Sequence, residues 1–148
     1  MAQAWLIFTG EVRKMTEEIS FTTESFYKFV REKKLMGAQC NKCGQITLPP
    51  RPMCPKCLSK DLKWKESPLK GKLLTYTVIH VSPQQFQSMA PYAVGIVELE
   101  NGAHLPGMIK GTPTDQIKVG MNLTLIFEDM PATTTNAWPQ WPRYHFKP

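Results

Sequence analysis

The sequence predicts a mainly β protein in which an N-terminal helical segment precedes a small cysteine-rich module and a C-terminal barrel of short strands. Three observations support this order. All cysteines lie between residues 40 and 57, the clearest helical pattern precedes them, and the chain after residue 71 is rich in β-branched and aromatic residues between turn signals. The length of 148 residues suits one ordinary domain or two small ones. We expect boundaries at 1–37, 38–68 and 69–148.

A helix is predicted over residues 22–36, "TTESFYKFVREKKLM". Thr22 or Thr23 can cap its N-terminus, and Gly37 is a suitable stop. The apolar positions follow the spacing of one helix face, at Phe26, Phe29 and Val30. This face needs a surface to pack against, either in the same chain or in a partner.

Residues 1–14 carry neither a membrane span nor an export signal. The apolar run from Ala4 to Phe8 is far shorter than the ~20 residues that cross a bilayer. Arg13 and Lys14 follow this run, whereas a secretory signal places its basic residues first. We therefore expect a cytoplasmic protein, with residues 1–14 as a native or added extension and a shorter helix within residues 2–19.

The C-terminal half has the pattern of a small barrel. Its strand-like runs are short, no convincing helix lies among them, and the dipeptide Asn101-Gly102 is the strongest hairpin signal. Pro106 and Gly107 suggest a bulge or bend in the return strand. This pattern favours an OB-like barrel. The expected strands are 72–81, 92–100, 103–111, 121–130 and 143–148, and a further strand at 62–66 closes the cysteine module.

The cysteines form two Cys-x-x-Cys pairs with ten residues between them. Two residues between cysteines let both sulfur atoms reach one ion at about 2.3 Å. Because the chain looks intracellular, metal binding is favoured over disulfides. Four thiolates leave no position for water, so we expect a structural site; zinc is the expected ion, although such a site also accepts iron. The predicted ligands are Cys40, Cys43, Cys54 and Cys57.

Positive charge is concentrated in the first half of the chain. The formal net charge is +6; residues 1–70 hold 13 Lys and Arg against 7 Asp and Glu, and residues 71–148 hold 5 against 5. A divalent ion on four thiolates contributes about −2, so a basic excess survives metal binding. It could attract the phosphates of a nucleotide, a nucleic acid or an acidic partner, although ordinary solubilising lysines explain it as well.

No catalytic centre is predicted. The chain has no recognised nucleophile, metalloprotease or phosphate-loop motif, and its histidines, His80, His104 and His145, are far apart in the sequence. Folding could still bring Glu98, Glu100 or Asp129 beside a histidine. We therefore expect a protein that is not an enzyme.

Two other functions remain open. A zinc module, a barrel and positive charge are a common combination in nucleic-acid-binding proteins. The expected strands at 92–100 and 103–111 hold one aromatic residue, two glutamates and one lysine, which makes a poor stacking platform and argues against nucleic-acid binding as the main role. An iron-bearing, rubredoxin-like electron carrier is the second alternative, and visible colour would decide it.

The order of motifs resembles a known family. After an aromatic N-terminal helix come "CNKCG", "PPR", "CPKC", "GKLLTYTVIHV", "PYAVGIVELENG" and "VGMNLTLIF". This order is similar to that of the zinc-ribbon/OB-fold proteins found beside thiolases and hydroxymethylglutaryl-CoA synthase, from about residue 22 to the C-terminus. The resemblance implies a rubredoxin-like ribbon, an OB-fold barrel and metal binding by the four cysteines. Leu58, where many relatives have glycine, should bend the second knuckle slightly.

The resemblance also implies a function. Such a protein would be a non-catalytic accessory or scaffold subunit with a potential acyl-CoA-binding role, partnering a thiolase or a hydroxymethylglutaryl-CoA synthase-like enzyme. The residues themselves offer candidate contacts, because coenzyme A carries phosphates and the first half of the chain carries cations. Simple packing and solvated charge explain the same residues equally well. The candidates are Arg51, Lys33, Lys34, Phe26, Tyr27 and Phe29.

Overall fold

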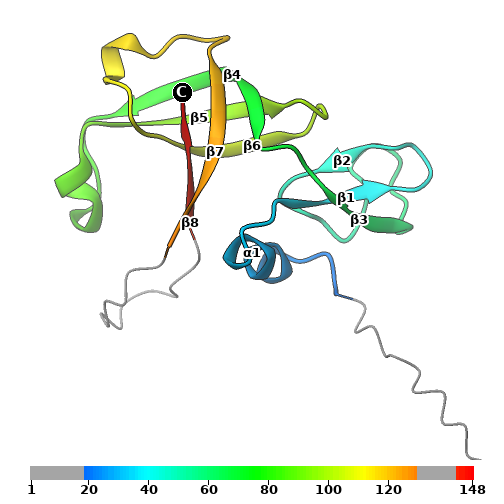
Figure 1. Ribbon diagram of the computed structural model, residues 1–148. Helices are drawn as coiled ribbons and strands as arrows, with labels where there is room; N and C mark the ends of the chain where they lie inside the picture. Colours follow the sequence, from blue (N-terminus) through cyan, green and yellow to red (C-terminus); the bar gives the residue numbers. More distant parts are fainter. Residues whose placement is uncertain (1–18, 130–142) are drawn as a thin grey trace, which may run out of the picture.

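The computed structural model describes residues 19–129 and 143–148 (Figure 1). Within them, helix α1 is followed by a three-stranded sheet and then by a closed five-stranded barrel. Two short 3-10 helices, η1 (Gln84–Met89) and η2 (Thr114–Gln116), lie in the barrel half. This architecture confirms the predicted fold class.

The expectations for the first residues cannot be compared with the fold, because residues 1–14 and most of the helix proposed within 2–19 lie outside the described part of the chain. In the described part, no helix is long and apolar enough to cross a membrane.

Helix α1 covers Thr23–Arg31 and packs its apolar face inward. The hydroxyl of Thr22 accepts a 3.3 Å hydrogen bond from the backbone N–H of Ser25, which confirms one of the two expected caps. Phe26 and Val30 are buried, as the spacing of the apolar residues predicted.

The predicted end of this helix was wrong, because α1 stops at Arg31 and Gly37 is not its stop. Lys33 adopts the left-handed conformation, with φ 59°, and the chain then becomes extended. Residues Met36–Cys40 form the central strand of a sheet, where neighbours on both sides satisfy their backbone groups. A Cβ at Gly37 would lie 3.1 Å from Leu48 Cδ2, so the glycine serves close packing.

The cysteine module is built on the three-stranded sheet of β1 (Met36–Cys40), β2 (Ile46–Thr47) and β3 (Leu62–Glu66). Strand β1 pairs antiparallel with both neighbours in the order β2-β1-β3. The β1–β3 ladder runs from Met36 opposite Glu66 to Cys40 opposite Leu62. The predicted strand at 62–66 is therefore confirmed, and it holds the first knuckle at the end of the sheet.

The barrel contains the five strands expected from the sequence. They close in the order β4-β5-β6-β8-β7, with β8 parallel to β6 and antiparallel to β7. The hairpin at Asn101-Gly102 is present, with Gly102 at φ 80°. The strands are β4 (Lys70–Ile79), β5 (Tyr92–Leu99), β6 (His104–Ile109), β7 (Asn122–Glu128) and β8 (Arg143–Lys147).

Of the bulge or bend expected at Pro106 and Gly107, the bulge is absent from the β5–β6 ladder, whose register is unbroken from Ala93–Ile109 to Glu98–His104. The irregularity lies in β4, between Leu73 and Thr75. Gly107 is needed for another reason. A Cβ there would lie 2.6 Å from Phe146 Cε2, so glycine lets β6 approach the aromatic core.

The helix, the sheet and the barrel share one hydrophobic core. Phe26 and Val30 of the helix and Leu48 of the cysteine module belong to the same buried cluster as Leu73 and Phe146 of the barrel. The ring of Phe26 meets Tyr144 edge-on at a centroid distance of 6.3 Å. This continuity joins the two modules mechanically, and the expected division at residues 37/38 and 68/69 stays a prediction.

Candidate metal centre and binding surfaces

Two similar backbone turns carry the four cysteines. In the first turn, the N–H of Gly44 donates to the carbonyl oxygen of Cys40 at 2.9 Å, and in the second the N–H of Leu58 donates to that of Cys54 at 2.9 Å. Gly44 and Leu58 both have positive φ, 74° and 59°. The second knuckle therefore keeps the turn geometry of the first, because Leu58 adopts the left-handed conformation that Gly44 has. The slight bend of the second knuckle expected from Leu58 is not seen in these turn hydrogen bonds.

The four sulfur atoms form one compact group. All lie within 4.8 Å of one another, and the pairs Cys40–Cys57 and Cys43–Cys54 are 3.5 Å apart. Four thiolates at about 2.3 Å from a tetrahedral ion would lie roughly 3.8 Å apart. The observed spacing brackets this value, so the predicted ligands fit a closed four-sulfur metal site.

Backbone N–H groups prepare two of the sulfur atoms for a cation. The N–H of Cys43 is the main cause that lowers the pKa of Cys40 to about 6, and the N–H of Cys57 is the main cause of the lowered pKa of Cys54. The Ser59 N–H acts likewise on Cys57, but the thiol of Cys40 and burial outweigh it and raise the Cys57 pKa to about 12. A bound cation would complete deprotonation of the group.

The candidate ligand residues differ in exposure and in their contacts. Arg51 is exposed on the loop between the knuckles, Lys34 is exposed after α1, and the Lys33 ammonium lies 3.1 Å from Asp129 Oδ1 in an exposed ion pair. Phe26 is buried in the core, and Tyr27 contacts its ring at 5.3 Å. The role of these residues toward a ligand stays a prediction.

Phe29 belongs to an aromatic group that the sequence did not reveal. Its ring meets Trp64 at a centroid distance of 4.9 Å, and Phe21 stacks on the same indole at 4.8 Å. The indole N–H of Trp64 donates to the carbonyl oxygen of Ile19 at 2.8 Å. These contacts dock the chain before α1 on strand β3, which supports packing as the role of Phe29.

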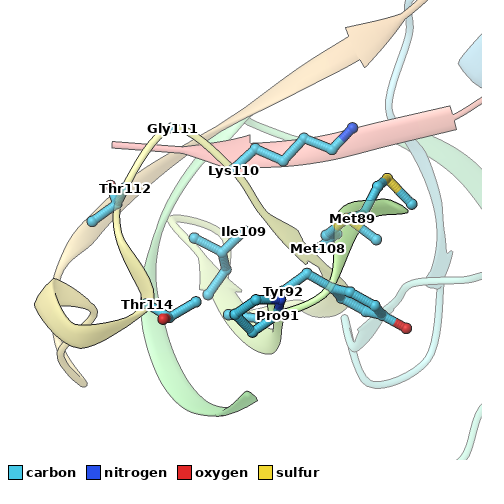
Figure 2. A pocket seen from close by; sticks show the side chains of 10 residues that line it. Met89, Pro91, Tyr92, Met108, Ile109, Lys110, Gly111, Thr112 and Thr114 are labelled. Atoms are coloured by element: carbon cyan, nitrogen blue, oxygen red, sulfur yellow. The ribbon is translucent and has the colours of Figure 1, made fainter. Parts of the chain in front are cut away.

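The barrel has a pocket of about 290 Å³ between η1, the start of β5, the end of β6 and the turn that leads to η2. Figure 2 shows methionine side chains at one end of this pocket and threonine side chains at the other. Its apolar lining includes Met89, Tyr92, Met108 and Ile109. The pocket has no signal in the sequence, because its walls come from two separate segments, 89–93 and 108–114, that the folded barrel brings together.

A charged group beside the pocket was also missed. His145 Nδ1 lies 2.7 Å from Glu128 Oε1, and the same carboxylate pairs with the ammonium of Lys110. Burial opposes ionisation of Glu128, but the hydrogen bond and charge of Lys110, with help from His145, hold its pKa below the ordinary value. The group closes the barrel between β6, β7 and β8.

Of the acidic residues that folding could bring beside a histidine, Glu98 lies near one and Asp129 pairs with a lysine. Glu98 Oε1 lies 4.0 Å from His104 Nε2 in an exposed pair, as the sequence allowed. Asp129 pairs with Lys33 instead, and His80 is exposed just after β4. The closest acid–histidine contact involves Glu128, which the sequence did not single out.

Comparison with known proteins identifies both modules. The model of the ChsH2 rubredoxin-like zinc ribbon domain matches residues 28–63, and that of the ChsH2 C-terminal OB-fold domain matches residues 64–128. A DUF35 domain-containing scaffold protein of Methanocaldococcus jannaschii is 40% identical over 95 residues, which are 63% of this chain and 67% of the relative.

One further relative and one solved structure carry the names of enzymes. A probable enoyl-CoA hydratase alpha subunit of Thermomonospora curvata is 32% identical over 100 residues, which are 68% of this chain but 31% of that protein. The solved structure described as Ltp2-ChsH2(DUF35) aldolase is similar with a TM-score of 0.68 and 29% identity, over 83% of this chain and 91% of that one.

Proposed function

Because this chain belongs to the DUF35 family of scaffold proteins with a zinc ribbon and an OB-fold, we propose that it is a non-catalytic subunit that binds an acyl-CoA enzyme. The observation that carries the proposal is the similarity over 83% of the chain to a chain of the structure described as Ltp2-ChsH2(DUF35) aldolase. The relative named an enoyl-CoA hydratase alpha subunit points to the same class of partner. Within that class we propose a thiolase or a hydroxymethylglutaryl-CoA synthase-like enzyme.

The chemistry of the cysteine site favours a structural role over a catalytic one. With four sulfur ligands a metal ion has no position for water or substrate, so Cys40, Cys43, Cys54 and Cys57 would hold it as a structural element. We propose zinc as this ion, since the four sulfur atoms lie close enough together to share one ion and zinc ribbons normally bind zinc. A red protein with visible absorption would instead indicate iron and an electron carrier.

We also propose that the barrel pocket holds part of an acyl-CoA. Its methionine end offers an adaptable apolar surface, and its threonine end offers hydroxyl groups. A pocket of about 290 Å³ suits a short acyl chain better than a whole coenzyme. The phosphates of the coenzyme would then lie outside the pocket, and Lys110, which lines it, is the nearest candidate cation.

The test of the main proposal is partner capture from the native host. The tagged full chain, loaded with zinc, should retain an acyl-CoA enzyme through washes at moderate salt, and mass spectrometry should identify it. Recovery of nucleic acid alone, with binding that falls steeply as salt rises, would sink the proposal and favour the nucleic-acid alternative.

Acyl-CoA binding is tested separately by calorimetry with acetyl-CoA, octanoyl-CoA and free coenzyme A. The pocket role predicts that Met108→Asp weakens binding of the acylated forms and leaves any binding of free coenzyme A unchanged. Equal loss for all three compounds would argue against an acyl site in the barrel.

A further inference from the structure

The second knuckle presents a leucine in an unfavourable setting. Leu58 has φ 59°, a left-handed conformation in which its Cβ crowds the backbone, and its side chain is 69% exposed. Gly44, at the same place in the first knuckle, has φ 74° and meets no such crowding. Neither backbone preference nor burial therefore explains the leucine.

The conformation of Leu58 is fixed by its neighbours. Its N–H donates to the carbonyl oxygen of Cys54, and the Cys54 N–H donates to the carbonyl oxygen of Ser59, both at 2.9 Å. The buried hydroxyl of Ser59 accepts from the N–H of Asp61 at 3.1 Å. The knuckle thus holds the leucine outward on a rigid base, and backbone strain of this kind is often kept for a function.

A second exposed apolar side chain and several exposed cations lie near this leucine in the sequence. Met53, directly before the knuckle, is 39% exposed. The stretch 33–60 contains six Lys and Arg residues and no Asp or Glu. Of these cations, Arg51, Lys56 and Lys60 lie closest in sequence to the knuckle, and all are exposed. We call the surface formed by Arg51, Met53, Lys56, Leu58 and Lys60 the knuckle surface.

We propose that the knuckle surface is the contact by which this chain docks on its enzyme partner, with Leu58 as the anchor. The occupant that fits is a protein surface with an apolar depression for Leu58 and Met53 and a rim of carboxylates for the cations. The inference rests on the proposed scaffold function and names the surface that performs it. The backbone at Leu58 is already fixed by its hydrogen bonds, so little backbone freedom is lost when the side chain is buried.

The chemistry of the patch favours a protein over a nucleic acid. Single-stranded nucleic acids bind on aromatic side chains that stack with the bases, and the knuckle surface contains none. Its apolar members are aliphatic or a thioether, which gain from burial in a shaped protein pocket. The cations would steer the approach and make association faster at low salt.

The test compares Leu58→Gly with Val119→Ser in the zinc-loaded full chain, against the acyl-CoA enzyme recovered by capture. Val119 is 64% exposed in a barrel turn and serves as a matched exposed apolar control. Leu58→Gly should raise the dissociation constant about tenfold or more, as expected for an interface anchor. Its melting temperature should stay equal or rise, because glycine suits the left-handed conformation. Met53→Ser should weaken binding less, and Val119→Ser should not change it.

Each other outcome overturns the proposal in a distinguishable way. If the enzyme binds Leu58→Gly as tightly as the wild type, the knuckle surface is wrong and the scaffold function stands. If the wild type retains no acyl-CoA enzyme, both fail together. If Leu58→Gly lowers the melting temperature along with binding, the leucine is structural. If an oligonucleotide binds and Leu58→Gly reduces that binding, the surface is a nucleic-acid site instead.

Discussion

Asn101 donates a 3.0 Å hydrogen bond from its side-chain amide to the hydroxyl of Ser67, which lies in the link between the ribbon and the barrel. The carbonyl oxygen of the same side chain accepts from the N–H of Ala103 at 3.1 Å, inside the β5–β6 hairpin. Ser67 is buried, and its backbone N–H donates to Leu35 at 2.8 Å. The Asn101 side chain thereby ties a barrel turn to Ser67, and the Ser67 backbone ties the link to the segment after α1.

Asn101→Ala should lower the free energy of unfolding by about 1–3 kcal/mol, because it leaves the buried Ser67 hydroxyl without its partner. Urea denaturation followed by circular dichroism measures this loss. The double variant Asn101→Ala/Ser67→Ala should lose less than the sum of the single variants, since both partners are then absent. Strictly additive losses would show that the hydrogen bond contributes nothing of its own.

Removal of the metal should unfold more than the ribbon. Cys40→Ser takes away one of the four sulfur ligands, and Leu48 of the ribbon belongs to the same core as the barrel. We expect a loss of more than about 4 kcal/mol, with both modules melting together. Metal content by atomic emission and thermal unfolding by circular dichroism measure this, and Lys42→Ser in the same knuckle is the control. A Cys40→Ser chain that binds no metal but keeps its melting temperature would refute the coupling.

The cysteine spacing and the Asn-Gly dipeptide are local signals. The hairpin predicted from the dipeptide was confirmed, and the four cysteines predicted from the spacing lie together, within 4.8 Å of one another, while their binding of a metal stays a prediction. A Cys-x-x-Cys turn and the hairpin turn at Asn101-Gly102 are formed by neighbouring residues, so they can be predicted from short stretches of sequence. The same holds for the cap at Thr22, which is formed with Ser25 three residues later. Fold class follows from these signals together with the strand-like runs.

The errors come from contacts between distant segments. The chain after Arg31 has a helical pattern, yet Met36–Cys40 is drawn into the sheet by partners at residues 46–47 and 62–66. His145 meets Glu128 because β8 inserts between β6 and β7, an order that no periodicity encodes. Leu58 looked like a minor departure from a glycine position, and only its φ and exposure marked it as a candidate contact.

Acidification should weaken the barrel through Glu128. Its pKa is lowered from the ordinary value of 4.5, because the hydrogen bond and charge of Lys110 and the charge of His145 outweigh burial. A lowered folded-state pKa gives stability that is present above about pH 4.5 and is lost as the pH falls through the folded-state value. In Glu128→Gln, the free energy of unfolding measured in urea should therefore fall less steeply with decreasing pH below about pH 4.5 than in the wild type. An exposed control, Glu100→Gln, should keep the wild-type slope, and an unchanged slope in Glu128→Gln would contradict the assignment.

Gly107→Ala should destabilise the barrel by overpacking its core. A Cβ at this position would lie 2.6 Å from Phe146 Cε2 and 3.2 Å from Tyr144 Cε2, and Phe146 is fully buried. Since neither ring can withdraw without moving β8, we expect a loss of about 1–3 kcal/mol in urea denaturation. Phe146→Leu removes the clashing ring atom and opens a cavity of its own, and the added methyl group would partly fill that cavity. The double variant Gly107→Ala/Phe146→Leu should therefore be more stable than the summed single losses predict. Losses that simply add would show that β6 accommodates the methyl group by a backbone shift away from Phe146.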